Sequence, residues 1–503
     1  MGLAALVLAG ACRPEPLPEF GNVLVQVDTD APVPGLVTRL RVDVFDGERW
    51  ISSRGFTVRA PGDWPASFVL YHPGEATRTS LVRLRAYADG TERDYLGERY
   101  LPPPSPSEAD DAIPAEPERT LEPRLFEDGE DRTPADEPSP NLTIDRLLRV
   151  ETRYGQSTAV RVVLRGDCFG VMADLAGRRT CVDGARPWES ADEVPSEAAT
   201  SAPSLVGSFP LVDVASEESP TPDGGGEVHD DEILVPGGVF VLGSRLLSEA
   251  DNGEATRVSA SPERVAVVQP FLVDRYEVTV ARYRLALARG FVPSALPYAN
   301  DGPMIKPTRD DASQTCTFSR EPRPGAERRE DYPVNCISHA QAREFCRFGH
   351  GDLLTEVEWE YVAMMAGRSA KAPYPWGFAA PTCDVITSRG GNIANSGCAF
   401  SPPSFGPARA TASELDETPL GVHGLFGNLA EWLVDAPLSY ASAAYRRAPL
   451  DAQQYDAPDA ERFVVRGQSW GLGPRNTTSS ARASESAKVR SPTIGFRCAR
   501  PAR

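Results

Sequence analysis

Two acidic, proline-rich stretches restrict where this chain can form folded domains. Residues 102–140 contain 12 acidic and 3 basic side chains together with ten prolines, and residues 185–232 contain 12 acidic side chains and 1 basic side chain. They account for the net charge of -19, so the rest of the chain is close to neutral. Such segments bury too little apolar surface to offset the entropy of the chain. We predict two folded regions, 13–184 and 232–501, with a disordered insert at 102–140 and an acidic flexible linker at 185–231.

The charge distribution also bears on the class of partner. The acidic side chains lie in the insert and the linker, and neither folded region has an excess of Lys and Arg. A nucleic-acid interface requires a basic face, so we expect no nucleic-acid partner.

The first folded region has the pattern of an antiparallel, all-β sandwich. Short alternating runs such as VLVQVDTD, LVTRLRVDVF, ASFVLY and LVRLRAYA are separated by Pro, Gly and Asp. A period of two places one face of each strand toward a core. The run VRVVLRGDCFG adds a strand after the acidic insert, so the insert is a long loop within this domain. No catalytic constellation is present, and we expect a spacer or docking module.

The chain begins MGLAALVLAGAC, which resembles the end of a bacterial lipoprotein signal. Residues 1–12 would be a signal remnant and Cys12 would carry the lipid. The run lacks a preceding Lys or Arg and has Ala9 where Leu is usual, and the alternative is a piece of a buried element. Because Arg13 rather than Asp follows the cysteine, we expect an outer-membrane lipoprotein of the bacterial cell envelope, attached to the membrane through its lipid anchor.

The number of cysteines agrees with export. There are nine, and lipidation of Cys12 leaves an even set of eight that can pair in an oxidising compartment. Cys168 and Cys181 are close enough in sequence to close a small loop. The alternative is a cytosolic protein with scattered thiols, but no CxxC or His-rich zinc spacing occurs.

The segment GVHGLFGNLAEWLVD, residues 421–435, combines three glycines with a carboxylate and a tryptophan. Glycines permit positive φ, so Glu431 and Trp432 are expected to follow a strongly bent backbone. Such a bend can direct carbonyl oxygens and Glu431 toward one calcium ion. The alternative is a tight turn whose glutamate forms a salt bridge.

Capping signals predict three helices in the second folded region. Thr279 precedes VARYRLALARG, which should end at Gly290. Ser338 with Gln341, and Thr355 with Glu358, form two capping boxes. The preceding run VPGGVFVLGS has the appearance of a hairpin.

Eight ordered motifs resemble those of the sulfatase-modifying factor family, whose founding activity is the formylglycine-generating enzyme. They are VPGGVFVLGS, PFLVDRYEVT, YPVNCISHAQAREFC, LLTEVEWEYVAMMAG, YPWG, GLFGNLAEW, VVRGQSWG and IGFRCAR, and they cover about residues 232–501. The resemblance implies an α+β, C-type-lectin-like fold with little regular secondary structure. It also implies a disulfide between Cys346 and Cys498. Cys316 with Cys336 and Cys383 with Cys398 follow from proximity only, because four cysteines permit three pairings.

The resemblance does not extend to the copper site. Formylglycine-generating enzymes bind copper through two cysteines after the tryptophan of the GGSW motif, and the matching positions here are Leu472 and Thr477. Neither side chain supplies a thiolate, so copper is not expected and we predict no catalytic residue there. The family's calcium turn corresponds to Gly427, Leu429 and Glu431, but Gly424 replaces its usual acidic side chain, which implies a weakened calcium site.

Four residues near these motifs are candidates for a ligand cleft. Arg466, Gln468, Trp470 and Arg497 combine an aromatic face with guanidinium groups, which suit a peptide, protein or glycan. The alternative places Trp470 in the core and Arg497 in an internal ion pair.

Two functions remain open on the sequence. The first is a non-catalytic binding or scaffold lipoprotein. The second is a divergent formylglycine-generating-type oxidase acting on protein or small thiol substrates. The related sulfoxide synthases bind iron through clustered histidines, and the five histidines of this chain form no HxxxH or HxE cluster.

Overall fold

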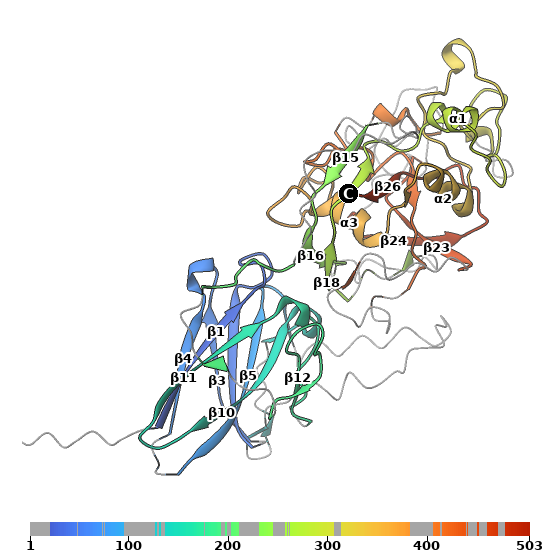
Figure 1. Cartoon of the computed structure of the whole chain (residues 1–503). Coiled ribbons are helices and arrows are strands. Elements are labelled where there is room, and N and C mark those ends of the chain that lie inside the picture. The colour runs from blue at the N-terminus through green and yellow to red at the C-terminus, as the bar shows by residue number, and fades with distance from the viewer. Residues whose placement is uncertain are drawn as a thin grey trace, which may run out of the picture.

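The structure is a computed structural model that describes residues 21–94, 126–210 and 231–502 with internal gaps, the longest at 245–256, 306–312, 383–405, 441–449, 452–459 and 471–477. Strands predominate, and the three α-helices of the described residues all lie in the C-terminal half (Figure 1). No described helix has both the length and the apolar character needed to cross a bilayer.

The N-terminal domain consists of two four-stranded sheets around one core. The first sheet has the order β14 (Glu197–Ala198), β11 (Ser157–Leu164), β1 (Gly21–Thr29) and β4 (Ala66–His72). The second has the order β10 (Ile144–Thr152), β5 (Arg78–Tyr87), β2 (Arg39–Asp46) and β3 (Arg49–Thr57). β1 pairs with β11 in parallel and with β4 in antiparallel fashion, so the sheets are not purely antiparallel as the alternating runs had predicted.

Strand alternation positions this core. Val23, Val25 and Val27 of β1 are buried, and the residues between them are partly exposed at the start of the strand. Each such valine removes apolar surface from water, worth about 1.5 to 3 kcal/mol per fully buried side chain. The two sheets therefore pack against each other through side chains that point inward at every second residue of a strand.

The outer face of the second sheet buries charge instead. Asp43 of β2 binds Arg83 at 2.6 Å and Arg41 at 2.9 Å, and Arg85 binds Asp145 at 2.9 Å. Burial alone would raise the pKa of Asp43. The positive charges of Arg83 and Arg41 outweigh this effect, and the pKa is lowered to about 2. These residues alternate with the inward apolar ones along β2 and β5, so the charged set forms a ladder across the strands.

This ladder corrects the prediction of a disordered insert at 102–140. Glu137 lies in β9 (Asp136–Pro138), which pairs with β6 (Glu92–Asp94), and its carboxylate binds both Arg41 and Arg85. β7 (Phe126–Glu127) and β8 (Glu130–Asp131) form a short pair. The end of the insert is thus ordered, because its acidic side chain neutralises two buried arginines. Residues 102–125 lie outside the described residues.

The predicted linker at 185–231 also begins too early. β12 (Arg179–Thr180) pairs with β13 (Glu189–Ser190), and β14 joins the first sheet. Phe209 is buried in the sandwich core, and the amide of Leu205 donates to Asp28 at 3.1 Å. Residues up to about 210 therefore belong to the N-terminal domain, because apolar and hydrogen-bonding groups interrupt the acidic sequence. Residues 211–230 lie outside the described residues.

Three small sheets form the C-terminal domain. They have the orders β15-β19-β26-β20, β16-β18-β22 and β17-β24-β23-β21-β25. Their strands are β15 (Glu232–Val235), β16 (Gly238–Leu242), β17 (Arg257–Val258), β18 (Arg264–Val268), β19 (Phe271–Asp274), β20 (Asp352–Leu353), β21 (Ala430–Trp432), β22 (Leu450–Asp451), β23 (Arg462–Arg466), β24 (Arg482–Ser486), β25 (Ile494–Gly495) and β26 (Cys498–Pro501). The hairpin predicted from VPGGVFVLGS is wrong, because β15 pairs with β19 and β16 with β18.

The three predicted helices are confirmed. α1 (Val280–Ala288) begins after Thr279, whose side chain accepts from the amide of Arg282. α2 (His339–Phe348) and α3 (Glu356–Met364) both have the predicted capping boxes. Their buried faces pack into two apolar clusters, one around Trp359 and one around Tyr283 and Phe345.

The two domains touch through β18. Val265 is buried in the same apolar cluster as the sandwich core, and Val267 packs against it. Arg264 donates to Asn141 Oδ1 of the sandwich at 2.6 Å and to the Tyr440 carbonyl of its own domain at 3.1 Å. Figure 1 shows β16 and β18 at the side of the C-terminal domain that faces the sandwich.

Candidate functional site

The glycine-rich segment 421–435 bends as predicted and leads into the core. Gly421 and Gly424 have φ values of 86° and 69°, and Asn428 has 65°. A Cβ atom at Gly421 would lie 2.9 Å from the Arg275 guanidinium, so both the angle and the space favour glycine there. The bend places Glu431 and Trp432 in full burial on β21.

Glu431 forms a salt bridge, which is the alternative to the calcium interpretation. Its Oε1 accepts from Arg497 Nε at 2.7 Å, and its Oε2 accepts from Trp359 Nε1 at 2.8 Å. Burial raises the pKa of Glu431, and the Arg497 guanidinium opposes that shift. Arg497 therefore supplies the positive charge that a calcium ion would have supplied, and the residues present do not fit a calcium site centred on this carboxylate.

Two further buried carboxyl groups hold the same turn. Asp416 Oδ2 accepts from the amides of Phe426 and Gly427, each at 2.9 Å. Glu277 accepts from the amide of Leu429 at 3.1 Å and from Asn428 Nδ2 at 2.6 Å. Burial raises the pKa of Asp416 to about 7 and that of Glu277 well above its usual value. The predicted calcium residues Gly427 and Leu429 are thus fixed through their amides by protein carboxyl groups.

Arg466 and Arg497 do not line an open cleft, because both are fully buried. Arg466 binds Glu356 at 2.9 Å and Glu360 at 2.5 Å, while Arg497 binds Glu431. Burial raises the pKa of Glu360, but Lys371 and Arg466 together bring it below its usual value. The prediction that these two arginines contact a ligand is therefore wrong, and the internal ion pair is what the structure contains.

Trp470 and Gln468 are also buried, with different surroundings. Trp470 Nε1 donates to the Pro492 carbonyl at 2.9 Å, which supports its assignment to the core. Within the described part of the chain, neither Oε1 nor Nε2 of Gln468 has a hydrogen-bond partner. A buried amide without partners costs about 1 to 3 kcal/mol. Among the described residues, Nε of Arg466 also has no hydrogen-bond partner, but the other nitrogens of that guanidinium are held by Glu356 and Glu360. Leu472 and Thr477 lie outside the described residues.

An open cleft of about 330 Å³ lies near the YPWG motif, which was recognised in the sequence but not assigned to a site. The Trp376 ring stacks on Tyr374 with centroids 5.1 Å apart and meets the edge of Phe426 at 5.3 Å. Arg368 donates through Nη2 to the Pro375 carbonyl, and its Nη1 has no partner among the described residues. The residues lining the cleft are Arg368, Pro375, Trp376, Leu415, Glu417, Thr418 and Pro419.

The cleft combines an aromatic ring with the positive charge of a guanidinium. Leu415 and the nearby Phe378 are exposed, which adds apolar surface at the rim. Burial lowers the pKa of Arg368, whose usual value is so high that it stays charged at neutral pH. Such a site can bind an apolar group together with a carbonyl or carboxylate oxygen.

Three disulfides connect the described cysteines. Cys346 pairs with Cys498, and Cys316 pairs with Cys336, as the resemblance and proximity implied. Cys168 pairs with Cys181 in the sandwich. Cys383 and Cys398 lie outside the described residues, as does Cys12.

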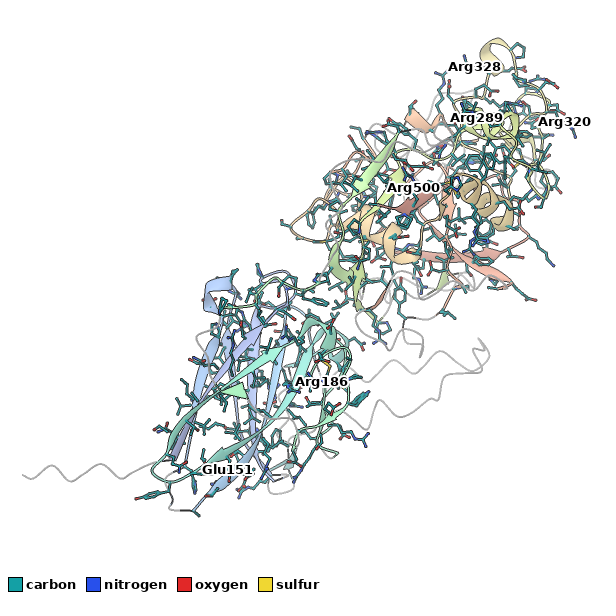
Figure 2. The ribbon with its side chains drawn as sticks, in the orientation of Figure 1. Glu151, Arg186, Arg289, Arg320, Arg328 and Arg500 are labelled. Atoms are coloured by element: carbon teal, nitrogen blue, oxygen red, sulfur yellow. A yellow bond between two sulfur atoms is a disulfide. The ribbon has the colours of Figure 1, made fainter. Side chains whose placement is uncertain are left out.

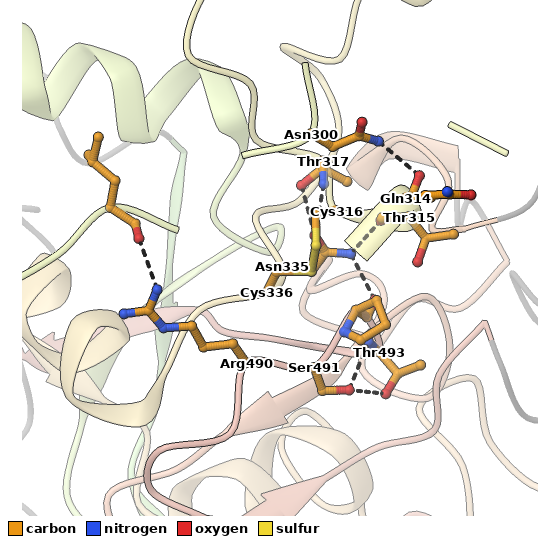
Figure 3. Close-up of a disulfide and its surroundings, with 12 residues drawn as sticks. Asn300, Gln314, Thr315, Cys316, Thr317, Asn335, Cys336, Arg490, Ser491 and Thr493 are labelled. Carbon is orange, nitrogen blue, oxygen red and sulfur yellow. Dashed lines mark hydrogen bonds between the residues drawn. A yellow bond between two sulfur atoms is a disulfide. The ribbon is translucent and has the colours of Figure 1, made fainter. Parts of the chain in front are cut away.

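The Cys316–Cys336 disulfide lies beside a hydrogen-bond network around Asn335, which we call the polar knot. Figure 3 shows Asn335 beside the Cys316–Cys336 bond, where its amide donates to the carbonyls of Thr315 at 3.0 Å and Pro492 at 2.7 Å. Its Oδ1 accepts from the amide of Thr317 at 2.9 Å. This knot joins the loops around α1 and α2 to the loop before β25, so it fixes irregular backbone that has no sheet to hold it.

The described histidines do not gather into a metal site. His339 is buried, stacks on Phe463 at 3.5 Å and contacts the Leu433 carbonyl at 2.9 Å. His423 stacks on Tyr276, and His72 lies in the sandwich. Across the described residues, no group of three or more His, Cys, Asp or Glu side chains could hold a metal ion.

The sequence of the C-terminal domain matches a family model. Residues 219–502 match the sulfatase-modifying factor enzyme 1-like domain. This chain belongs to the sulfatase-modifying factor family. The match starts 13 residues before the predicted boundary at 232, and it covers all three sheets and all three helices of the C-terminal domain.

Several relatives of this sulfatase-modifying factor domain have curated names. Hercynine oxygenase of Mycolicibacterium smegmatis is 27% identical over 53% of this chain and 59% of its own length. Inactive C-alpha-formylglycine-generating enzyme 2 of Bos taurus is 26% identical over 53% of this chain and 87% of its own length. Formylglycine-generating enzyme of Bos taurus is 25% identical over 74% of its own length. The chain thus spans only 59% of the first of these relatives.

PvdO from Pseudomonas aeruginosa is 21% identical, with 56% of this chain and 99% of that chain covered and a TM-score of 0.40.

Proposed function

We propose that this chain is an envelope lipoprotein whose sulfatase-modifying factor domain binds a peptide and does not oxidise it through copper. The observation that carries the proposal is the presence of Leu472 and Thr477 where the family resemblance places two copper-binding cysteines. Cu(I) requires soft thiolate or thioether ligands, whereas leucine has no donor atom and threonine has only a hydroxyl. A substrate cysteine alone would lack two further sulfur ligands.

The state of the remaining cysteines supports this proposal. All six described cysteines are in disulfides, and a disulfide sulfur is not a thiolate. The relatives also show that the domain is not tied to one activity, because one carries the name of an inactive formylglycine-generating enzyme. The domain can therefore occur without formylglycine-generating activity.

An extended peptide is the ligand class that fits the cleft beside Trp376. Two prolines and Leu415 line it with apolar surface, and an aromatic ring presents a face for side-chain packing. Arg368 lines the cleft, and its positive charge can attract a carboxylate of the peptide. A glycan would demand several polar side chains around the aromatic ring, and the cleft has only Arg368, Glu417 and Thr418.

The lipid anchor rests on the sequence before Cys12. Its attachment would place the domain at the surface of the membrane, where secreted or envelope peptides are the available ligands. Metabolic labelling with palmitate should label the wild type and leave Cys12→Ser unlabelled. Equal labelling of both proteins would refute the anchor.

Oxidation is tested with the full chain and a cysteine-bearing peptide. The chain is incubated under air with copper and reductant, with an active formylglycine-generating enzyme as the positive control. Mass spectrometry should detect formylglycine in the control only. Conversion by this chain would overturn the proposal and favour the divergent oxidase, the alternative that the similarity to hercynine oxygenase keeps in view.

Binding is tested with a library of peptides displayed in solution. Trp376→Leu and Arg368→Met should each lower the affinity for the peptides that the wild type selects. A loss of about tenfold or more is expected when a hot-spot aromatic residue or arginine is removed. Arg347→Ala is a matched control, because Arg347 is an exposed arginine that binds Asp352 and does not line the cleft. Equal losses in all three variants would show that the peptides bind elsewhere. Selection of glycans instead of peptides would refute the ligand class.

A further inference from the structure

One end of the sandwich is defined by where β1 begins. Gly21 pairs with His72 and Asn22 with Tyr71, and the amide of Asn22 donates to the Gln156 carbonyl at 2.9 Å. Arg78 binds Asp46 at 2.5 Å across the same end. The described residues of the turns 46–49, 72–78 and 152–157 therefore lie together, and we call them the β1-entry end. Figure 2 labels Glu151, which precedes the third turn, at an end of the sandwich away from the C-terminal domain.

The exposed apolar side chains of the sandwich are concentrated toward this end. Tyr71 is 71% exposed and Tyr154 is 39% exposed, and Val69 of β4 and Ile51 of β3 are also exposed. Of the large apolar residues that are exposed in the described part of the sandwich, only Trp188 lies apart from this group. The opposite end instead meets β18 of the C-terminal domain through the apolar core and Asn141. The two ends thus present different chemistry.

The charges at the β1-entry end are balanced. Arg153 binds Glu151 at 3.1 Å, and Arg78 binds Asp46. Arg49 is exposed at the first turn. Tyrosines flanked by arginines and acids match the interfacial region of a bilayer, where amphipathic rings sit among zwitterionic and anionic headgroups. Balanced charge also means that attraction to anionic lipid is not the main contribution.

The length of chain before β1 indicates what contacts the β1-entry end. Eight residues lie between Cys12 and Gly21, and the nine steps from one to the other reach about 30 Å when fully extended. A lipid on Cys12 therefore keeps the β1-entry end within that distance of the membrane. We propose that this end, through Tyr71 and Tyr154, lies on the lipid headgroups and holds the C-terminal domain on the far side of the sandwich. This proposal rests on the lipid anchor of the proposed function.

Hydrogen exchange of the full chain on vesicles tests this orientation. The lipidated protein is reconstituted on vesicles of phosphatidylethanolamine and phosphatidylglycerol, and Cys12→Ser without vesicles is the reference. Amides of His72, Gly74 and residues 76–78, and of residues 153–157, should exchange on the order of tenfold more slowly on vesicles. The turn at 61–63, at the other end, should be unchanged. In Tyr71→Ser/Tyr154→Ser, the protein should still float with the vesicles and the protection should be lost. Trp188→Ser, an exposed aromatic away from this end, should keep it.

Each other outcome is decisive. Flotation without protection would leave the anchor intact and overturn the orientation. No flotation of the wild type would overturn the anchor and this inference together, while the peptide-binding proposal would stand on its own assay. Protection of the same turns in concentrated Cys12→Ser without vesicles would assign the surface to a second copy of the chain and overturn the membrane assignment. Protection in the double variant equal to wild type would exclude the tyrosines as the contact.

Discussion

Both domains bury charged side chains, but they balance them differently. In the sandwich, three arginines face three carboxylates, namely Arg41, Arg83 and Arg85 with Asp43, Glu137 and Asp145. Around the turn at 421–435, the three carboxyl groups of Glu277, Asp416 and Glu431 surround one arginine, Arg497. Pairing keeps the pKa of Asp43 low, and the lack of pairing lets burial raise the pKa of Asp416 and Glu277.

This difference follows from how each domain is held together. The sandwich is built from long strands whose alternation separates an apolar face from a charged face. The C-terminal domain has short strands and long loops, and it depends on buried polar groups that satisfy backbone amides. Its polar groups therefore take the place of a ladder of strand hydrogen bonds.

The largest expected contrast concerns the disulfides. Cys346 and Cys498 are 152 residues apart, and Cys168 and Cys181 are 13 apart. Loop-closure entropy gives about 5 kcal/mol for the first bond and about 3 kcal/mol for the second. Replacing both cysteines of each pair by alanine should lower the free energy of unfolding of its own domain by these amounts. Denaturant unfolding followed by hydrogen exchange of each domain measures this, and equal losses would contradict the chain-entropy account.

Part of this comparison could be predicted from the sequence. Periodicity gave the sandwich strands, and capping residues gave α1, α2 and α3, because both signals are local. The partners of β15 and β16 could not be obtained from the sequence, since β15 pairs with a strand that follows more than 30 residues later. The order at Glu137 was missed because composition does not show that an acidic residue neutralises Arg41 and Arg85.

The site shows the same limit. The bend at 421–435 was predictable from its glycines, but the partner of Glu431 was not. Arg497 is 66 residues away, and only the fold brings it to the carboxylate. The cleft at Trp376 was missed because Arg368 and Leu415 come from separate loops, and YPWG was the only local signal for it.

Removing the charge of Glu431 should destabilise the C-terminal domain. Glu431→Gln keeps an acceptor for Trp359 but removes the salt-bridge partner of the buried Arg497, and breaking a buried pair costs about 3 to 5 kcal/mol. Thermal unfolding of the variant and of the wild type, with and without a calcium chelator, separates the two interpretations of this carboxylate. We expect the variant to melt earlier and the chelator to leave the wild type unchanged. If the chelator lowered the melting temperature of the wild type as much as the substitution does, the calcium interpretation would be supported instead.

The two domains should respond to pH in opposite directions. The folded pKa of Asp43, about 2, lies below the unfolded value of about 3.9, so its contribution of about 2 kcal/mol is present above pH 4 and lost as the pH falls toward 2. The folded pKa of Asp416, about 7, lies above the unfolded value, so its contribution is present below pH 4 and lost as the pH rises through 7.

Domain-resolved hydrogen exchange between pH 2 and 8 measures both responses. In Asp43→Asn, the free energy of unfolding of the sandwich should depend less on pH in the acid range. In Asp416→Asn, that of the C-terminal domain should depend less on pH near neutrality. A neutral-side slope that persists in Asp416→Asn would assign it to another group.

The smallest effect is expected at the contact between the domains. Asn141→Ala removes the acceptor of one Arg264 hydrogen bond, worth about 1 to 3 kcal/mol for a charged donor, while Arg264 keeps the Tyr440 carbonyl. The two domains should then unfold in more widely separated steps by calorimetry. Asn22→Ala, at the other end of the sandwich, is the control, and an equal effect there would remove the interface explanation.

Copper binding tests the central claim most directly, because it requires no knowledge of the substrate. The mature full chain is titrated with Cu(I) against a chelator of Cu(I), and Leu472→Cys/Thr477→Cys serves as the variant that supplies two thiols. We predict that the wild type removes no copper from the chelator and that the double variant removes about one equivalent, since two thiolates suffice to bind Cu(I). One equivalent of copper held by the wild type would contradict the account, because it would show a thiolate or equivalent soft ligand where we find Leu472 and Thr477.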